Sequence, residues 1–138
     1  MNWNECKINR LVKEIKADLE LISSLVIQSN KKIITDSFSP LNSDTVSTKL
    51  CNNYDSLREI LEALALQNGF KIYNHECFTG FLKEILKLEK EAFDFDNLRK
   101  VRNSINYYGE DVSIEDGGKL IKEVQMLRKK LIKLVKIK

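Results

Sequence analysis

The sequence lacks long apolar runs: none reaches the roughly 18 residues that a membrane-spanning helix needs. Its first ten residues, MNWNECKINR, are polar and charged where a signal peptide would carry an apolar core. Neither an internal repeat nor the alternation of polar and apolar residues typical of strands is present. These absences favour a helical, cytoplasmic protein that is not inserted in a membrane.

Cysteine, histidine and proline are scarce. Three widely spaced cysteines (Cys6, Cys51, Cys77) form no C-x-x-C pair, and His75 is the only histidine. An odd number of cysteines in a cytosolic chain predicts free thiols. These four residues would suffice for a zinc site by number, but only His75 and Cys77 are close in sequence. We therefore expect no metal site, and no pattern indicates a cofactor.

The composition is that of one globular domain covering residues 1–138. Hydrophobic residues are 43% and charged residues 31%, and the net charge is only +3. Positive charge is concentrated at residues 119–138, which hold eight Lys and Arg, among them Lys138, against one acidic residue, Glu123. Such a segment could attract phosphates, but the solvated outer face of a terminal helix is the favoured interpretation.

Apolar residues three and four apart predict five helices. They cover about 5–29, 44–68, 75–90, 94–109 and a last segment that runs to the C-terminus. Residues 31–42 contain the only proline and should form a loop. Asn74 can cap the third helix, while Phe93 and Leu98 would form a hydrophobic staple at the start of the fourth, which ends at Gly109. The predicted fold is an all-α, up-and-down bundle with neighbouring helices antiparallel.

The last helix has two candidate caps, Ser113 and Asp116, and its first turn is weakened by Gly117 and Gly118. One side of it carries a heptad-like apolar row. The row consists of Leu120, Val124, Leu127, Leu131 and Leu134. It would suit either the core of the bundle or a partner helix.

Residues 97–109, NLRKVRNSINYYG, carry the most informative surface. One face, predicted to pack inward, holds Leu98, Val101, Ile105 and Tyr108. A different face holds what we name the Arg102 stripe: Arg99, Arg102, Asn103 and Asn106. Guanidinium groups match phosphate geometry, and carboxamides can bind a base edge or a 2′-hydroxyl. The alternative is an ordinary polar helix face with surface ion pairs.

Residues 55–86 (DSLREILEALALQNGFKIYNHECFTGFLKEIL) and 98–109 (LRKVRNSINYYG) resemble the HEPN superfamily, the nucleotide-binding domains shared by higher eukaryotes and prokaryotes. The resemblance covers residues from about 50 to 110. It implies a helical bundle that forms a homodimer, with the motifs of the two subunits near the two-fold axis. Many such domains are metal-independent ribonucleases, often toxins paired with a nucleotidyltransferase antitoxin. Others only bind nucleotide or RNA.

The family motif is an Arg, usually followed by Asn or another polar residue, with a His about five positions after the Arg. Arg102 and Asn103 match its start, but the His position falls on Tyr107. In active members the His acts as acid or base on the 2′-hydroxyl, and Tyr, with a pKa near 10, substitutes poorly. On an ideal helix Asn106 shares the face of Arg102, whereas Tyr107 lies about 140° away and would join only if the helix unwinds near Gly109.

Two further polar residues are candidates. Glu59 could face the Arg102 stripe, but a solvated helix residue or an orienting salt-bridge partner is favoured. His75 directly follows the expected cap, so a local structural role is favoured over catalysis. In related toxins a tyrosine near the motif can be adenylylated, and Tyr107 or Tyr108 is the corresponding candidate.

Three hypotheses follow. In the first, the domain binds RNA or nucleotide through the Arg102 stripe without cleaving it. In the second it is a metal-independent ribonuclease: Arg102 stabilises the phosphorane, Asn103 and Asn106 position the phosphate, and Tyr107 carries the proton. In the third it is an adaptor whose last helix binds a partner helix. We rank binding slightly above cleavage.

Overall fold

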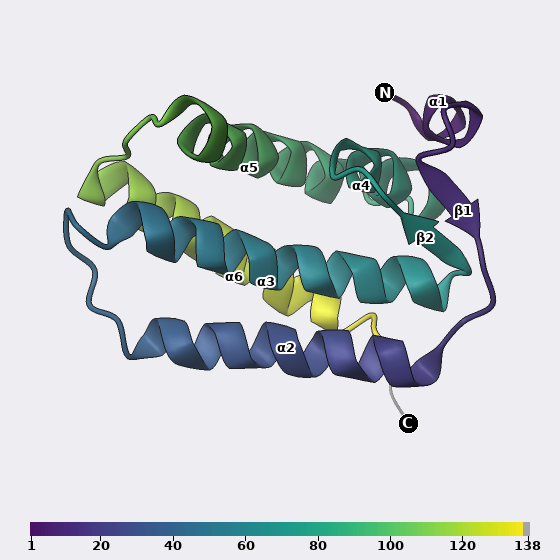
Figure 1. The fold of residues 1–138 in the computed structure, drawn as a ribbon, viewed down its shortest axis with the longest axis horizontal. Helices are drawn as coiled ribbons and strands as arrows, with labels where there is room; N and C mark the ends of the chain where they lie inside the picture. The colour runs from purple at the N-terminus through teal and green to yellow at the C-terminus, as the bar shows by residue number, and fades with distance from the viewer. Residues whose placement is uncertain (137–138) are drawn as a thin grey trace.

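The computed structural model describes residues 1–136, and helices account for most of them (Figure 1). The elements in chain order are α1 (Trp3–Ile8), β1 (Val12–Glu14), α2 (Leu19–Ser37), α3 (Val46–Gln67), β2 (Phe70–Ile72), α4 (Glu76–Gly80), the π-helical turn η1 (Phe81–Ile85), α5 (Glu89–Tyr108) and α6 (Ile114–Ile132). The predicted all-α bundle is therefore confirmed. Within residues 1–136 no helix is long and apolar enough to span a bilayer.

Helix α3 forms the centre of the core. It packs mainly against α2, which runs antiparallel beside it, and against α6 (Figure 1). Its fully buried side chains include Tyr54, Leu57, Ile60, Leu61 and Leu64, and Phe78, Phe81 and Phe95 join them from α4, η1 and α5. Burying each such side chain contributes about 1.5–3 kcal/mol, so this apolar contact is the main source of stability. The predicted boundaries of α3, about 44–68, agree with the observed helix to within two residues.

The expected helix over 5–29 is wrong, as is the expectation of no strands. Helix α1 ends at Ile8, and Arg10 has a positive φ of 58°, which no helix continues through. The chain then forms β1, which pairs antiparallel with β2 so that Val12 lies opposite Ile72. Asp18 starts α2 by accepting a hydrogen bond from the backbone of Leu21 (3.1 Å).

Helix α2 continues to Ser37, so the loop expected from residue 31 begins seven residues late. Lys49 of α3 explains the extension. Its Nζ lies 2.9 Å from Asp36 Oδ1 and also donates to the backbone carbonyls of Asp36 and Ser39 (2.9 and 2.8 Å). These bonds tie the last turn of α2 and the residues after it to α3.

Helix α5 begins at Glu89 rather than near Asp94, because the preceding break falls at Lys87, whose φ is 60°. Phe93 consequently lies inside the helix and is 67% exposed. The predicted hydrophobic staple between Phe93 and Leu98 is therefore wrong. Acidic residues in the first turn, Glu89 and Glu91, favour the observed start through the helix dipole.

Helix α6 begins after Ser113, whose hydroxyl accepts from the backbone of Asp116 (3.1 Å). Gly117 allows α6 to approach α3 closely, since a Cβ there would lie 2.1 Å from Val46 Cγ2. The apolar row packs into the core, except for Leu134, which is 42% exposed. The lysines of α6 are exposed, the helix ends at Ile132, and Lys138 lies outside the described residues.

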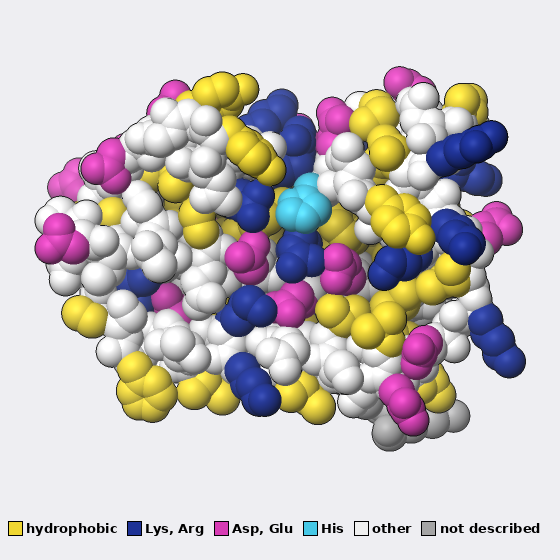
Figure 2. Space-filling view, viewed as in Figure 1, with side chains coloured by type: hydrophobic (Ala, Val, Ile, Leu, Met, Phe, Trp, Pro, Cys, Tyr) yellow, Lys and Arg dark blue, Asp and Glu magenta, His cyan; other side chains and the backbone are white. Residues whose placement is uncertain are grey.

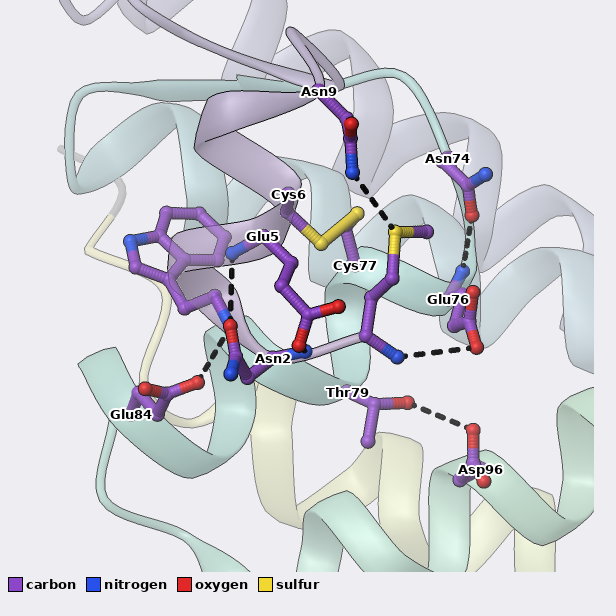
Figure 3. Close-up of a disulfide and its surroundings, with 12 residues drawn as sticks. Asn2, Glu5, Cys6, Asn9, Asn74, Glu76, Cys77, Thr79, Glu84 and Asp96 are labelled. Carbon is purple, nitrogen blue, oxygen red and sulfur yellow. Dashed lines mark hydrogen bonds and ion pairs between the residues drawn. A yellow bond between two sulfur atoms is a disulfide. The ribbon is translucent and has the colours of Figure 1, made fainter.

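A disulfide joins Cys6 of α1 to Cys77 of α4, and both residues are fully buried (Figure 3). The prediction of free thiols is thus wrong for this pair, whose partners are far apart in sequence and meet only in the fold. Among residues 1–136, Cys51 is the one free cysteine. Trp3 packs in the same corner, its ring 5.1 Å from that of Phe70.

Candidate functional site

An open cleft lies between the β2–α4 connection and α5. One wall consists of Tyr73, Asn74, His75 and Glu76, and the other of Arg99, Arg102, Asn103 and Tyr107. We name it the Arg102 cleft. Its volume of about 420 Å³ is within the range of ligand pockets. Figure 2 shows basic side chains gathered around the single histidine near the middle of this face.

The face of α5 that lines the cleft is set by burial of the opposite face. Leu98 is buried, and Val101 and Ile105 pack partly against the core, as predicted. The fourth residue expected to point inward, Tyr108, is 78% exposed, so the prediction is wrong for this residue. The helix remains regular through Tyr108, yet Tyr107 reaches the edge of the cleft without the unwinding that ideal helix geometry suggested.

The side chain of Arg102 is held from three directions. Its Nη2 lies 3.6 Å from Asp55 Oδ1, and the centre of its guanidinium is 5.4 Å from the Tyr54 ring, a cation–π distance. With the amide oxygen of Asn106 facing the guanidinium, it accepts from Nε and Nη2 of Arg102 (2.9 and 3.3 Å). Only 17% of the Arg102 side chain is exposed, so its orientation is fixed by the protein.

Asn106 lies on the same face of α5 as Arg102, as its spacing predicts, and its amide bonds to that residue. It is not part of either wall of the cleft, and it supports Arg102 instead. The other end of its amide lies 3.5 Å from Cys51 Sγ. Burial raises the pKa of the Cys51 thiol, against the opposing effect of Arg102 and with a further rise from Asp55. Cys51 is consequently an un-ionised thiol at neutral pH.

Arg99 is fixed by Asp96, one turn earlier on α5. Its Nη2 and Nε donate to Asp96 Oδ1 (2.9 and 3.1 Å), which also accepts from Thr79 Oγ1 (3.2 Å). Burial disfavours ionisation of Asp96, but hydrogen bonds from Arg99 and Lys100 outweigh it and lower the pKa of this carboxyl. The Asp96 carboxyl is thus ionised at neutral pH, and Arg99 lines the cleft in a defined orientation.

His75, for which the sequence favours a local structural role, lines the cleft. His75 occupies the N-cap position of α4 without a capping bond from its side chain. The side chain of Asn74 accepts from the backbone of Glu76 (2.8 Å). The His75 ring packs beside Tyr54 and Phe78, and its Nδ1 lies 3.3 Å from the Tyr54 hydroxyl. Burial raises the pKa of this hydroxyl, so it stays protonated and available to His75 at neutral pH.

The pKa of the His75 imidazole is lowered by its surroundings. Burial, followed by the charges of Arg58, Arg102 and Arg99, lowers the pKa of its imidazole to about 4. Every charge that shifts it is a guanidinium, and every one lowers it. His75 is therefore neutral at pH 7, and three arginines from two helices contribute positive potential at the same point of the cleft.

Glu59 does not face the Arg102 stripe, and it is not solvated. It is 6% exposed, and its Oε1 lies 2.7 Å from Lys32 Nζ of α2, so among the predicted roles the salt-bridge partner is the observed one. Nearby, Arg128 of α6 donates to Ser29 Oγ (2.9 Å). The carboxylate that contacts Arg102 is instead Asp55, one turn before Glu59 on α3.

The four candidate zinc ligands are not assembled, because Cys6 and Cys77 are bonded to each other. Within residues 1–136 no three His, Cys, Asp or Glu side chains gather as a metal site would require. Comparison of the chain with protein families, curated proteins and solved structures finds no matching family and no significant similarity. The resemblance to HEPN domains rests on the residues quoted above and stays a prediction.

Proposed function

We propose that the Arg102 cleft binds the phosphate groups of RNA or a nucleotide and does not cleave the ligand. The observation that carries this proposal is that Arg99 and Arg102 line one cleft. Burial lowers the pKa of His75 in this cleft, and the charges of Arg58, Arg102 and Arg99 lower it further. A phosphate there would exchange solvent for fixed guanidinium donors in a positive potential.

The carboxylates near these arginines do not exclude a phosphate. Each guanidinium has one acidic partner, namely Glu62 for Arg58, Asp96 for Arg99 and Asp55 for Arg102. A guanidinium has five N–H donors, and among residues 1–136 the contacts of Arg102 use only Nε and Nη2. The partners therefore orient the arginines and leave donors for a ligand.

The test is an affinity measurement with a fluorescently labelled single-stranded RNA in EDTA, comparing the parent with Arg102→Gln. Loss of charge-assisted hydrogen bonds worth about 1.5–3 kcal/mol should weaken binding about 10- to 100-fold. Lys129→Gln removes the same charge from the exposed side of α6 and should change affinity little. Equal affinity of the parent and Arg102→Gln would reject the proposal.

A metal-independent ribonuclease is the second candidate, because the structure brings a neutral imidazole beside Arg102. His75 would take the proton of a 2′-hydroxyl, whose oxygen attacks the adjacent phosphorus and expels the 5′-oxygen, while Arg102 stabilises the charge. A pKa near 4 makes His75 a weak base, so binding still ranks above cleavage. RNA cleavage in EDTA that His75→Ala abolishes would rank cleavage above binding. RNA left intact by the parent would exclude the ribonuclease.

The resemblance also leads us to propose that the chain forms a homodimer and pairs with a nucleotidyltransferase antitoxin. We further propose that it is located in the cytoplasm. Light scattering that gives the 16.0 kDa of one chain would reject the homodimer. In most cells the cytosol keeps cysteines reduced. A count of free thiols in the protein as it exists in cells would therefore test the cytoplasmic location, because it shows whether Cys6 and Cys77 are bonded there. Burial of the apolar row of α6 within the bundle removes the main motivation for an adaptor.

A further inference from the structure

Two tyrosines line the Arg102 cleft from different segments. Tyr73 directly follows β2, and Tyr107 lies in the last turn of α5. The two residues are 57% and 72% exposed, so both rings are accessible to a ligand. Neither ring stacks on another aromatic ring of residues 1–136; Tyr73 has only Lys71 Nζ over it, at 5.8 Å.

The same cleft also presents charged and hydrogen-bonding groups. Arg99 and Arg102 offer guanidinium donors, and Asn103 offers a carboxamide that can pair with the edge of a base. Exposed aromatic faces beside cationic groups are the combination that binds single-stranded nucleic acid, because bases stack while phosphates meet the charge. A site for phosphate alone would have no use for the two rings.

We propose that Tyr73 and Tyr107 stack on nucleobases of the ligand, so that the cleft selects single-stranded RNA over duplex RNA and over polyphosphate without bases. This inference rests on the proposed function, because the arginines hold the phosphates of the same ligand. In a duplex the bases are already stacked and paired, and their faces cannot reach the tyrosines. Polyphosphate has no base to stack.

The experiment measures anisotropy of a labelled single-stranded RNA of mixed sequence, in EDTA and at physiological salt. The same RNA annealed to its complement and inorganic tripolyphosphate are the comparison ligands. Tyr73→Leu and Tyr107→Leu should each weaken binding of the single strand about 5- to 100-fold and leave competition by tripolyphosphate unchanged. Tyr73→Phe and Tyr107→Phe keep the ring and should bind like the parent.

Tyr108→Leu is the matched control. Tyr108 is the neighbour of Tyr107 and is equally exposed, but it is not part of the cleft wall. Its substitution should leave affinity within about twofold of the parent, since no base reaches it. Circular dichroism of each variant verifies that these exposed substitutions leave the fold intact.

The outcomes separate this inference from the proposed function. If Arg102→Gln loses binding while Tyr73→Leu and Tyr107→Leu bind like the parent, stacking is overturned and phosphate binding stands. Equal affinity of the parent for single strand and duplex also overturns stacking. If the parent binds no RNA, the proposed function fails and stacking fails with it.

Discussion

Breaking the Cys6–Cys77 disulfide should destabilise the chain by about 4 kcal/mol. The bond closes a loop of sequence separation 71. In the chain-entropy treatment, a loop of this length removes about 15 cal/mol/K from the unfolded state, or about 4 kcal/mol at 25 °C. Domains of this size are stable by about 5–15 kcal/mol in total, so the bond would account for a large share.

Urea unfolding measures this contribution in the oxidised parent, in the reduced parent and in the double variant Cys6→Ala, Cys77→Ala. With a slope of about 2 kcal/mol per molar urea, the midpoint should fall by about 2 M in the last two samples. The only tryptophan, Trp3, is 6% exposed in the same corner as the bond, so its fluorescence reports on α1 while circular dichroism reports on all helices. Cys51→Ala is the control, since Cys51 forms no disulfide.

Two results would refute this reasoning. Titration of the unfolded, unreduced protein should find one thiol, and three thiols would show that the bond does not form. An unchanged urea midpoint on reduction, with one free thiol before and three after, would also refute it. This result would show that closing the loop does not lower the conformational entropy of the unfolded chain as calculated. An earlier loss of the Trp3 signal than of helicity in the reduced protein would localise the effect to α1.

Other predictions concern packing and titration. Gly117→Ala should destabilise the chain by about 1–2 kcal/mol, because the clash of the new Cβ with Val46 exceeds the gain of about 1 kcal/mol in helix propensity. Gly118→Ala meets only Leu41 Cδ2 at 3.4 Å and should stabilise it, and thermal unfolding of the two variants checks both signs. His75 should titrate near pH 4 in an NMR titration, and Arg102→Gln should raise its pKa. The pKa of His75 in the folded chain lies below the roughly 6.5 of an unfolded chain, so its contribution to stability is present above pH 6.5 and is lost as pH falls through 4. Urea midpoints across this window, compared between the parent and His75→Ala, check that dependence.

The long helices could be predicted because each buries one face against the others. Helical spacing located α3, the body of α5 and α6 without reference to the rest of the fold. The break after α1 could not be predicted, because Ile8, Val12 and Ile15 continue a helical spacing through it. Pairing of Val12 with Ile72, a contact between distant parts of the sequence, determines the extended conformation there.

The same distinction applies to the cleft. Arg99, Arg102 and Asn103 share a face of one helix, and their spacing was sufficient to group them. Asp55 and His75 come from other elements, and only tertiary packing brings them to Arg102. Asn106 was grouped correctly by its spacing, but spacing does not show that its amide is bonded to Arg102.

The pairing of β1 with β2 has a consequence for the order of folding. Helices α2 and α3 are consecutive in the chain and pack along their length, so their contacts form early, whereas β1 must wait until the segment after α3 is in place. Substitution of Val12 should therefore accelerate unfolding and leave the folding rate nearly unchanged. The N-terminal segment would then determine how long the native state persists, and the α2–α3 hairpin how fast it forms.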